Sequence, residues 1–538
     1  MPEQESNGEI SVSLAPYTGP WTKVEAAHLL RRTMFGPTNQ QILDVVTNGM
    51  ASSVTTLLQI PATFDPLAFD ANEGIVPLGT TWINAVYPTD VGLAQSTETA
   101  RSISMGSWAI ERINTETFSI AEKICLFWQN HFSATPAPDS RATYDYYMLM
   151  RSQALGNFKQ LVNDMTINPT MLLFLNGATN NVFSPNENYA RELLELFTIG
   201  KGPQIGPGDY TNYTEEDIAA AAKILTGYYV DGVRSDTLTS VSPVFNALLH
   251  DSSTKTMSAH FGGATVVDNG ANEYSDLIDI IFQQDECASF ICRKLYRYFV
   301  NYDLTVDVET NVISEMALTL LANNYDILPV LTELFSSEHF YDIAVRGAII
   351  RGPLETVFSM FNTTESVPNF NLNTDSWMRL NVYGYCEIMG QAYSSPPSVA
   401  GWPAYYQEPS FSKLWMNSTH LKSRFDAASI VTFLTGIPVL GEFWKVDALN
   451  FVDNLSVPSD PVVVIEDIAD VYCPKGLDAG QKLILKLILT DGQPDTEWTI
   501  QYSQYLGDPG NPTFSDPIRT RVELVLANVF QKPEFHTM

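Results

Sequence analysis

Cysteine, histidine and basic side chains are scarce in this chain. Its 538 residues include five cysteines and seven histidines. The cysteines are odd in number and no two have C-x-x-C spacing, which argues against a disulfide framework. Most of them lie in apolar helical patterns, where cysteine is usually a small buried side chain. A reducing compartment therefore fits the cysteine pattern best.

Positive charge is the second shortage. The chain has 30 Lys and Arg against 61 Asp and Glu, which gives a net charge of −31. Binding to nucleic acid or to an anionic membrane needs clustered basic side chains, so we expect neither partner. The acidic surface keeps the protein soluble, and it would also suit a saline setting or cation binding.

Signals for export and membrane insertion are also missing from the sequence. Its first residues, Met-Pro-Glu-Gln-Glu-Ser, lack the basic and apolar segments of a signal peptide. No run of about 18 apolar residues occurs, so no membrane span is predicted. We expect a cytoplasmic protein on the sequence as given, and an exported one if a leader was removed from it.

The common catalytic templates are absent as well. The sequence contains no H-E-x-x-H, no G-x-S-x-G, no phosphate-binding loop and no dinucleotide fingerprint. An active site would therefore have to be assembled from residues that are far apart in the sequence.

Apolar side chains, by contrast, are plentiful. The chain is 45% hydrophobic and 11% aromatic, which is ample for a large core. Apolar residues recur mainly at helical spacing, which predicts a mainly α-helical protein built on a large multi-helix globular domain with a few short strands. We expect an N-terminal arm over residues 1–20, a helical domain over 21–435, and a C-terminal helical extension over 436–538 packed on it.

Several stretches depart from this helical pattern. Residues 59–92 are rich in Pro, Thr and Gly and predict a long loop. Residues 241–249 and 264–268 are the candidates for short strands. In the C-terminal extension, prolines mark loops around two expected helices, at about residues 477–489 and 515–531.

The most polar of the expected helices begins near residue 186. It places five polar side chains within about two turns, while the neighbouring leucines serve the core. Such a helix is either a solvated ladder of ion pairs or a binding surface. We expect Arg191 and Glu192 to be mostly buried and hydrogen-bonded to groups distant in sequence. The five side chains are Glu187, Asn188, Arg191, Glu192 and Glu195.

Histidines and carboxylates from distant segments supply candidate ligands. His131 ends an amphipathic helix, and His250 with Asp251 lies in a non-helical stretch. Together with His28 and Glu192 they offer groups that bind zinc, iron or manganese, or that act as general acid and base. For each group alone a structural interpretation competes: a helix-end histidine often only forms hydrogen bonds, and a His-Asp pair often stabilises a turn.

A rigid loop is the last feature that could serve binding. Adjacent prolines and glycines over residues 390–403 hold Trp402, with other aromatic residues nearby. Aromatic side chains on a rigid loop suit stacking on a sugar or on a partner protein. The alternative is that Trp402 fills part of the core.

These same segments carry a family likeness. The chain resembles the bacterial family known as domain of unknown function 1800, and six motifs occur in that family's order over about residues 24–435. The likeness implies a helical protein, frequent export, and a gene often found beside one for a sulfatase-like family. The motifs lie at residues 26–32 with 35–37, 128–132, 186–193, 250–255, 290–297 and 396–402.

Two departures from the family pattern bear on function. The family usually has His-Asn-His-Phe where this chain has Gln129, Asn130, His131 and Phe132, so a ligand or acid–base role of the first position is lost or altered. The usual export leader is also missing from this sequence. The family has no generally established activity to carry over.

Two hypotheses about function follow from the sequence. The first is a hydrolase-like enzyme, metal-assisted or acid–base, acting on an envelope or extracellular polymer or glycan. The second is a non-catalytic structural or assembly protein that makes protein–protein contacts, including a homo-oligomer. No cofactor and no set of metal ligands is assigned by the sequence. Under the first hypothesis the candidate catalytic residues are His131, Glu192, His250 and Asp251, and the candidate binding residues are His28, Glu187, Asn188, Arg191 and Trp402.

Overall fold

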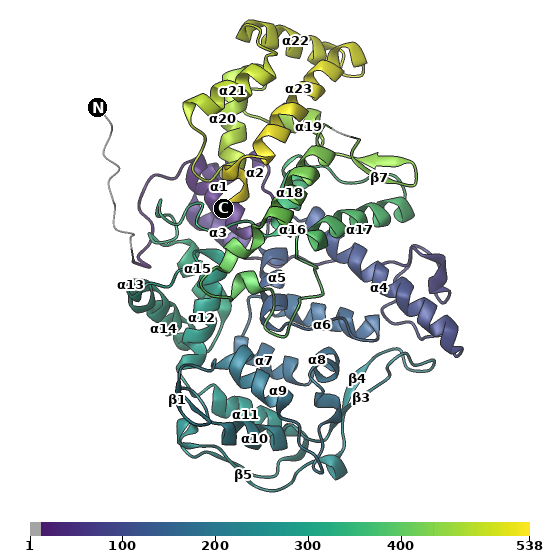
Figure 1. Cartoon of the computed structure of the whole chain (residues 1–538), viewed down its shortest axis with the longest axis vertical. Helices are drawn as coiled ribbons and strands as arrows, with labels where there is room; N and C mark the ends of the chain where they lie inside the picture. The colour runs from purple at the N-terminus through teal and green to yellow at the C-terminus, as the bar shows by residue number, and fades with distance from the viewer. Residues whose placement is uncertain (1–11, 434) are drawn as a thin grey trace.

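The computed structural model describes residues 12–433 and 435–538, and 56% of the protein is helical. Typical globular proteins are about 30–35% helical, so the prediction of a mainly α-helical protein is confirmed. The helices stack in layers along the long axis of the molecule (Figure 1). The C-terminal helices form one end, and a layer of helices and small hairpins forms the other.

The first helices belong to the middle of the molecule (Figure 1). The sequence predicts one helix over residues 40–58, but Gly49, with φ of 76°, divides it into two. The connection from α3 to α4 is mostly irregular, as predicted for residues 59–92. These helices are α1 (Lys23–Thr33), α2 (Asn39–Asn48), α3 (Met50–Leu57), α4 (Val91–Asn114), α5 (Ala121–His131) and α6 (Ser140–Ser152).

The next helices form the layer drawn at the bottom of Figure 1. Thr214 and Asp217 form the capping box that the sequence indicates at the start of α10. A π-helix, Leu193–Thr198, continues directly from α9. The α-helices are α7 (Phe158–Thr166), α8 (Pro169–Phe174), α9 (Glu187–Glu192), α10 (Glu215–Ile224) and α11 (Glu273–Ile281).

Three antiparallel hairpins of short strands accompany this layer. The strand prediction at residues 241–249 is confirmed for its first half, since a 3₁₀ turn covers residues 247–249. The prediction at 264–268 is confirmed by β6. The pairs are β1 (Gln204–Gly206) with β2 (Asp209–Tyr210), β3 (Tyr228–Asp231) with β4 (Ser242–Phe245), and β5 (Lys255–Thr256) with β6 (Thr265–Val266).

Two further groups of helices complete the domain. Helices α12 to α15 flank the middle of the molecule, and α16 to α18 lie beneath the C-terminal helices (Figure 1). Their bounds are α12 (Glu286–Phe299), α13 (Val306–Val308), α14 (Ser314–Ala322), α15 (Ile327–Phe335), α16 (Pro353–Thr363), α17 (Leu372–Ile388) and α18 (Ser418–Val431).

The C-terminal region is more helical than the sequence predicts. Pro461, expected in a loop, is the first residue of a helix and is preceded by the N-cap Asp460. Proline is favoured there because the first helical N–H has no partner in any case. The elements are β7 (Ile437–Val439), β8 (Glu442–Trp444), α19 (Ala448–Asp453), α20 (Pro461–Tyr472), α21 (Ala479–Leu489), α22 (Asp495–Gly507) and α23 (Pro512–Phe530).

Polar contacts fasten this region to the first helix. Lys23 forms an ion pair of 2.6 Å with Asp467 of α20. Arg31 donates to the backbone carbonyl oxygens of Asp470 and Val471, at 2.6 and 3.2 Å. Through these contacts the C-terminal region is packed against the first helix.

The described part of the N-terminal arm also lies against the body. The amide of Tyr17 donates to the carbonyl of Ser336, and the amide of Glu338 donates to that of Ala15. Residues 1–11 of the predicted arm lie outside the described residues.

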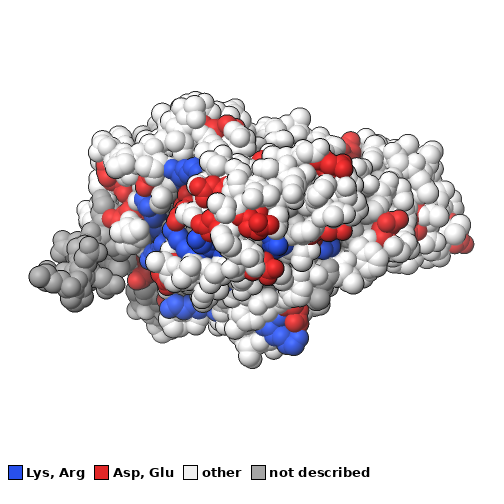
Figure 2. Space-filling view, turned by 90° about the horizontal axis from the view of Figure 1, so that it is seen from above, with Lys and Arg blue, Asp and Glu red and all other residues white. Residues whose placement is uncertain are grey.

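One large apolar cluster runs through the molecule. All five cysteines are buried and unpaired. No described helix has the length and apolar character needed to cross a membrane. On the face seen in Figure 2, acidic and basic side chains lie beside one another around a hollow.

Candidate metal centre

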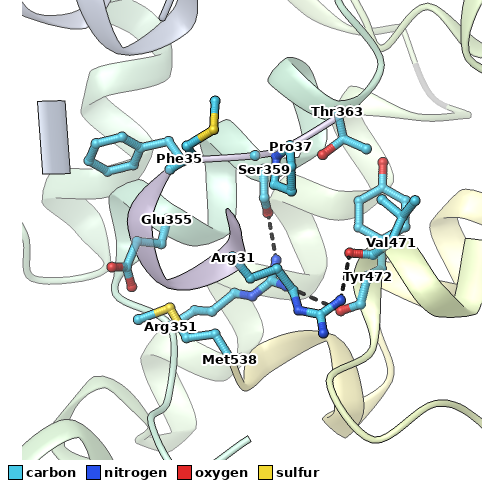
Figure 3. A pocket seen from close by; sticks show the side chains of 12 residues that line it. Arg31, Phe35, Pro37, Arg351, Glu355, Ser359, Thr363, Val471, Tyr472 and Met538 are labelled. Carbon is cyan, nitrogen blue, oxygen red and sulfur yellow. Dashed lines mark hydrogen bonds between the residues drawn. The ribbon is translucent and has the colours of Figure 1, made fainter. Parts of the chain in front are cut away.

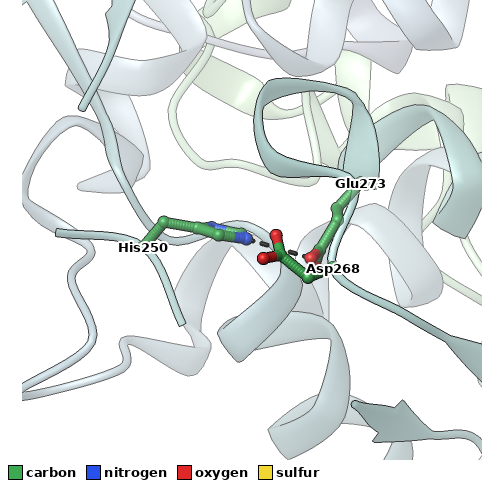
Figure 4. A group of neighbouring side chains, drawn as sticks. All are labelled: His250, Asp268 and Glu273. Atoms are coloured by element: carbon green, nitrogen blue, oxygen red, sulfur yellow. Dashed lines mark ion pairs between the residues drawn. The ribbon is translucent and has the colours of Figure 1, made fainter. Parts of the chain in front are cut away.

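A cluster of possible metal ligands lies between the segment after β4 and the start of α11 (Figure 4). His250, Asp268 and Glu273 point toward one another, and one donor atom from each lies within 4.8 Å of the others. In the described parts of the chain, this is the only group of three or more His, Cys, Asp or Glu donors that meets this spacing.

The ring of His250 is fixed by its surroundings. Its side chain is 3% exposed, and Nδ1 lies 2.9 Å from the carbonyl oxygen of Thr226. A carbonyl oxygen can only accept, so Nδ1 carries the proton and donates this bond. In the neutral ring, Nε2 therefore presents its lone pair to the centre.

The other ring nitrogen is close to a carboxylate but makes no hydrogen bond. Nε2 of His250 lies 3.1 Å from Oε1 of Glu273, yet the geometry leaves this buried nitrogen without a hydrogen-bond partner. Two lone pairs at this distance repel, and either a proton on Nε2 or a cation between the two atoms would relieve the repulsion. At metal sites, histidine is commonly held in this way, with its second nitrogen bonded to a carbonyl or carboxylate.

Glu273 is the second buried donor, and a lysine orients it. Lys255 Nζ donates to Oε2 of Glu273 at 2.6 Å, and the Glu273 side chain is 0% exposed. Its Oε1 faces His250 and accepts a longer bond of 3.3 Å from the amide of Asn269. Lys255 therefore holds one carboxylate oxygen and leaves the other directed into the centre.

Asp268 gives the centre an exposed side. Around a tetrahedral ion with bonds of about 2.0–2.2 Å, two ligand atoms lie roughly 3.4 Å apart. The donor atoms of this cluster lie within 4.8 Å of one another, which is a wider spacing. Because Asp268 is exposed, rotation of its side chain can shorten this spacing. One imidazole and two carboxylates suit zinc or manganese, and the exposed side leaves room for water.

Asp251 stabilises a turn beside this centre. Its Oδ1 accepts from the amide and the hydroxyl of Ser253, at 2.9 and 2.5 Å. Burial opposes ionisation of Asp251, but these hydrogen bonds outweigh it and lower the pKa of the carboxyl. The contacts are those of the turn interpretation considered for the His-Asp pair.

His131 contacts a different part of the protein. Its Nε2 donates to the carbonyl of Phe197 at 3.1 Å, and Nδ1 lies 3.2 Å from Nζ of Lys294. Lys294 also donates to the carbonyl of Leu196 at 2.9 Å. Burial and the neighbouring Lys294 hold the pKa of His131 well below its usual value. Both ring nitrogens are thus engaged, and the two side chains together bond the carbonyls of the π-helix.

His28 lies on α1, where it is buried against the segment that follows α15. Its Nε2 donates to the carbonyl of Phe340 at 2.9 Å. Burial, with the nearby Arg32 and Arg31, holds the pKa of His28 well below its usual value. The ring is therefore neutral and serves packing and hydrogen bonding in the core.

A small cavity opens beside this helix (Figure 3). Arg31 and Arg351 cross it, and Arg351 donates to the hydroxyl of Ser359 and to the carbonyl of Tyr472, at 2.9 and 3.1 Å. Its volume is about 10 Å³, which is room for about one water molecule. The arginines join α1, α16 and α20 there and leave no space for a substrate.

The polar helix α9 is largely a surface ladder. Arg191 bonds Glu215 through both carboxylate oxygens, at 2.9 and 2.7 Å, and approaches Glu187 at 3.4 Å. The bond to Glu215 is distant in sequence, as predicted, and it raises the pKa of Arg191. The side chain is 31% exposed, so Arg191 is partly buried and is not enclosed in the core.

The prediction that Glu192 is hydrogen-bonded to groups distant in sequence is wrong. The residue is only partly buried, and no described residue forms a hydrogen bond or an ion pair with its side chain. Burial and the charge of Glu195 raise its pKa. Asn188 is exposed and donates to the carbonyl of Leu175 at 3.1 Å, which anchors α9 to the end of α8.

Trp402 fills the core instead of being displayed on the loop. Its side chain is fully buried, and its amide donates to Oδ1 of Asn130 at 2.9 Å. Gly401 makes this approach possible, since its φ is 91° and a Cβ there would lie 2.2 Å from the same oxygen. Of the two interpretations of this loop, the core interpretation is the one observed.

Sequence reasoning found one member of the centre and missed two. His250 was among the candidates, and Lys255 lies in one of the family motifs. Glu273 was missed because an acidic residue in the first turn of a helix usually only complements the helix dipole. Asp268 was missed because the segment around it looks like an ordinary turn.

The fold and the centre together define a large, mainly helical protein with a buried imidazole–carboxylate cluster in a layer of hairpins. The chain belongs to the family described as "Protein of unknown function (DUF1800)", whose model matches residues 28–537. This match confirms the resemblance seen in the motifs, and it extends through the C-terminal region. No curated protein and no solved structure matched the chain.

Proposed function

We propose that this protein is a metal-assisted, hydrolase-like enzyme that acts on an envelope or extracellular polymer. The observation that carries the proposal is the buried Nε2 of His250, which has no hydrogen bond and faces two carboxylates. With Glu273 and Asp268 it would hold a divalent ion such as Zn²⁺ or Mn²⁺. When bound, such an ion lowers the pKa of a coordinated water and polarises a carbonyl or phosphoryl oxygen.

The protein's own side chains have defined parts in this proposal. The carbonyl of Thr226 orients His250, and Lys255 orients Glu273. The exposed position of Asp268 would give a large substrate access to the ion. The catalytic roles considered for His131 and Glu192 stay predictions, and the hydrogen bonds of His131 favour a supporting role.

Metal binding to the full chain tests the proposal directly. After treatment with a chelator, the protein is titrated with Zn²⁺ or Mn²⁺ alone and the bound ion is measured by calorimetry and by elemental analysis. We expect one tightly bound ion per chain and a higher melting temperature, because a ligand that binds only the folded state stabilises it. His250→Gln and Asp268→Asn should each weaken binding by more than about tenfold.

A second histidine of the same layer provides the matched control. His260 is partly exposed and pairs with Asp209 at 2.9 Å, outside the centre. His260→Gln should leave the affinity unchanged. Absence of stoichiometric binding to the wild-type protein would refute the proposal, and so would equal losses in the His250 and His260 variants.

Assembly through the C-terminal helices is the second candidate function. Leu483, Ile484 and Leu487 on α21 are 54%, 55% and 48% exposed, and their spacing places them on neighbouring parts of the helix surface. Grouped exposed apolar side chains often mark a protein contact. Light scattering of the wild type and of a Leu483→Glu, Leu487→Glu variant tests self-association through this face. A wild-type protein that is monomeric at all concentrations excludes the homo-oligomer.

A further inference from the structure

A second polar cavity lies far in sequence from the metal ligands and shares no residue with them. It opens between the segment after α3, the end of α4 and the starting turn of α5, and its volume is about 240 Å³. This is somewhat smaller than the roughly 300–1,000 Å³ of sites for drug-sized ligands. The residues that line it include Pro61, Ala62, Phe64, Arg112, Glu116, Glu122 and Arg151.

Two buried charges in this cavity are incompletely paired. Arg112 and Glu122 are 2% and 5% exposed, and Nε of Arg112 lies 3.8 Å from Oε2 of Glu122, too far for a hydrogen bond. Nε and Nη1 of Arg112 and Oε2 of Glu122 have no hydrogen-bond partner. Arg151 bonds the other carboxylate oxygen of Glu122 and the carbonyl of Pro61. Buried groups of this kind normally find a partner, in the protein, in water or in a ligand.

A third group offers a proton to the cavity. Oε1 of Glu116 accepts from the amide of Phe35 at 2.6 Å, while Oε2 is buried without a partner. Burial raises the pKa of Glu116 to about 8, so the carboxyl is largely neutral at pH 7. Because Oε1 accepts a hydrogen bond, the proton belongs on Oε2, where it is available for donation.

The remaining wall of the cavity is apolar and partly open. Phe64 is 43% exposed, and Pro61 and Ala62 are exposed beside it. An aromatic side chain at the edge of a polar pocket suits the C–H face of a sugar ring, which is apolar while its rim is polar.

We propose that this cavity binds one neutral sugar residue. Hydroxyl groups both donate and accept, so a sugar can accept from Arg112 and Glu116 and donate to Glu122. A phosphate or carboxylate ligand would also pair with Arg112, but it would be repelled by the ionised Glu122. The sugar sits as a free monosaccharide or as the end residue of a glycan. This site stands whether or not an ion binds at His250.

Binding of defined sugars to the full chain tests the proposal. The probes are glucose, galactose, mannose and N-acetylglucosamine, with the disaccharides cellobiose and chitobiose, measured by saturation-transfer NMR and calorimetry. We expect at least one probe to bind. Stronger binding of a disaccharide than of its monosaccharide would identify a glycan end as the occupant, and equal binding a free sugar.

Variants at the exposed edge avoid disturbing the buried charges. Ala62→Trp should block the cavity and abolish binding, and Phe64→Ala should weaken it by about two- to tenfold, the range of aromatic stacking losses. Phe183→Ala is the control, since Phe183 is 82% exposed and does not line the cavity. Circular dichroism should show an unchanged fold in all three. The proposal is overturned if no probe binds, in which case the cavity holds water only, or if Ala62→Trp binds like the wild type.

Discussion

At the scale of the residue, single buried carboxyl groups make the stability of the folded protein depend on pH. Glu116 shows the cause most clearly. Its carboxyl is removed from water and its Oε2 has no partner, so ionisation is disfavoured in the folded state. The amide of Phe35 favours the charged form but offsets only part of this effect. The unfolded chain has no such constraint, so the two states bind different numbers of protons near neutral pH.

Replacement of Glu116 by glutamine is expected to stabilise the protein in a pH-dependent way. The folded pKa of about 8 lies above the ordinary glutamate value of 4.5, so the wild type loses stability as pH rises between these values. Each pH unit in this window contributes about 1.4 kcal/mol for one fully buried group. The variant should melt like the wild type near pH 4 and at a higher temperature near pH 8.

The measurement is a thermal melt of both proteins across this pH range. Glu187→Gln serves as the control, because Glu187 is exposed and only approaches Arg191 at 3.4 Å. A difference between Glu116→Gln and the wild type that does not grow with pH would contradict the assignment of a raised pKa.

Residue types and spacing predict such sites only in part. His250 was found because imidazole is rare in this chain and chemically versatile. Its partner Glu273 lies 23 positions away, and only the return of the chain through β5 and β6 brings the two together. Arg191 and Glu192 were predicted to be buried because their helix is so polar. Glu215, the partner of Arg191, is itself on the surface.

At the scale of the element, the π-helix that follows α9 depends on side chains from other helices. It ends at Thr198, so the carbonyl groups of its last turn have no donor within the helix. Lys294 of α12 donates to one of these carbonyls, and His131 of α5 donates to the next. The lysine is buried, and burial lowers its pKa to about 7.

Replacement of Lys294 by methionine is expected to change how stability depends on pH. The unfolded lysine holds its proton up to about pH 10, while the folded one releases it near pH 7. The wild type therefore gains stability as pH rises from 7 toward 10, and Lys294→Met should lack this gain. The free energy of unfolding of the wild type, relative to that of the variant, should therefore rise by up to about 1.4 kcal/mol for each pH unit in this range.

An exposed lysine provides the comparison for this experiment. Lys159 is 37% exposed and pairs with an exposed aspartate, so Lys159→Met should differ from the wild type by a constant amount between pH 7 and 9. Chemical denaturation at several pH values supplies the data. Parallel curves for the Lys294 variant and the wild type would show that the buried amine keeps its ordinary pKa.

The loop that carries Trp402 offers a second test at this scale. Gly401 and Gly441 both have φ of 91°, but only at Gly401 would a Cβ collide with a neighbour, at 2.2 Å from Asn130. Gly441→Ala should cost about 1–2 kcal/mol, the usual penalty of a left-handed conformation. Gly401→Ala should cost more than about 3 kcal/mol, because Asn130 or Trp402 must also move.

Thermal melts of the two glycine variants separate conformational strain from collision. Similar losses at both positions would mean that the loop adjusts freely and that Trp402 is not tightly held by Asn130.

Local signals account well for the elements themselves. The expected helices at about residues 477–489 and 515–531 correspond to α21 and α23, and the capping residue Thr214 marks the start of α10. The misses have physical causes. A proline that begins a helix resembles a proline that breaks one, as at Pro461, and Gly49 ends α2 only because the chain turns there. The π-helix has the same apolar pattern as an α-helix, so the sequence pattern does not distinguish the two.

The whole molecule is joined through its last residues. Phe535 is 0% exposed and packs against Tyr472 of α20 and Phe530 of α23. The guanidinium of Arg351, just before α16, lies 4.8 Å from the Phe535 ring. The C-terminal helices and the body of the protein therefore share a core at this point.

Truncation of this side chain is expected to weaken the entire fold. Phe535→Ala should cost about 3–5 kcal/mol, the usual loss for a buried phenylalanine. Phe183→Ala, at an 82% exposed site, should be close to neutral. Calorimetry of both variants should show a single transition that shifts for Phe535→Ala. An early melting step confined to the C-terminal helices would instead show that they fold separately.

The five buried thiols have a practical consequence. They occur on α5, α12 and α17 and at the end of α20, and burial raises the pKa of Cys125 and Cys473 to about 12. An alkylating reagent attacks the thiolate and must reach it, so each thiol reacts only when its surroundings open. Pulsed alkylation followed by mass spectrometry can thus record, in the unmodified protein, which layer opens first and how often.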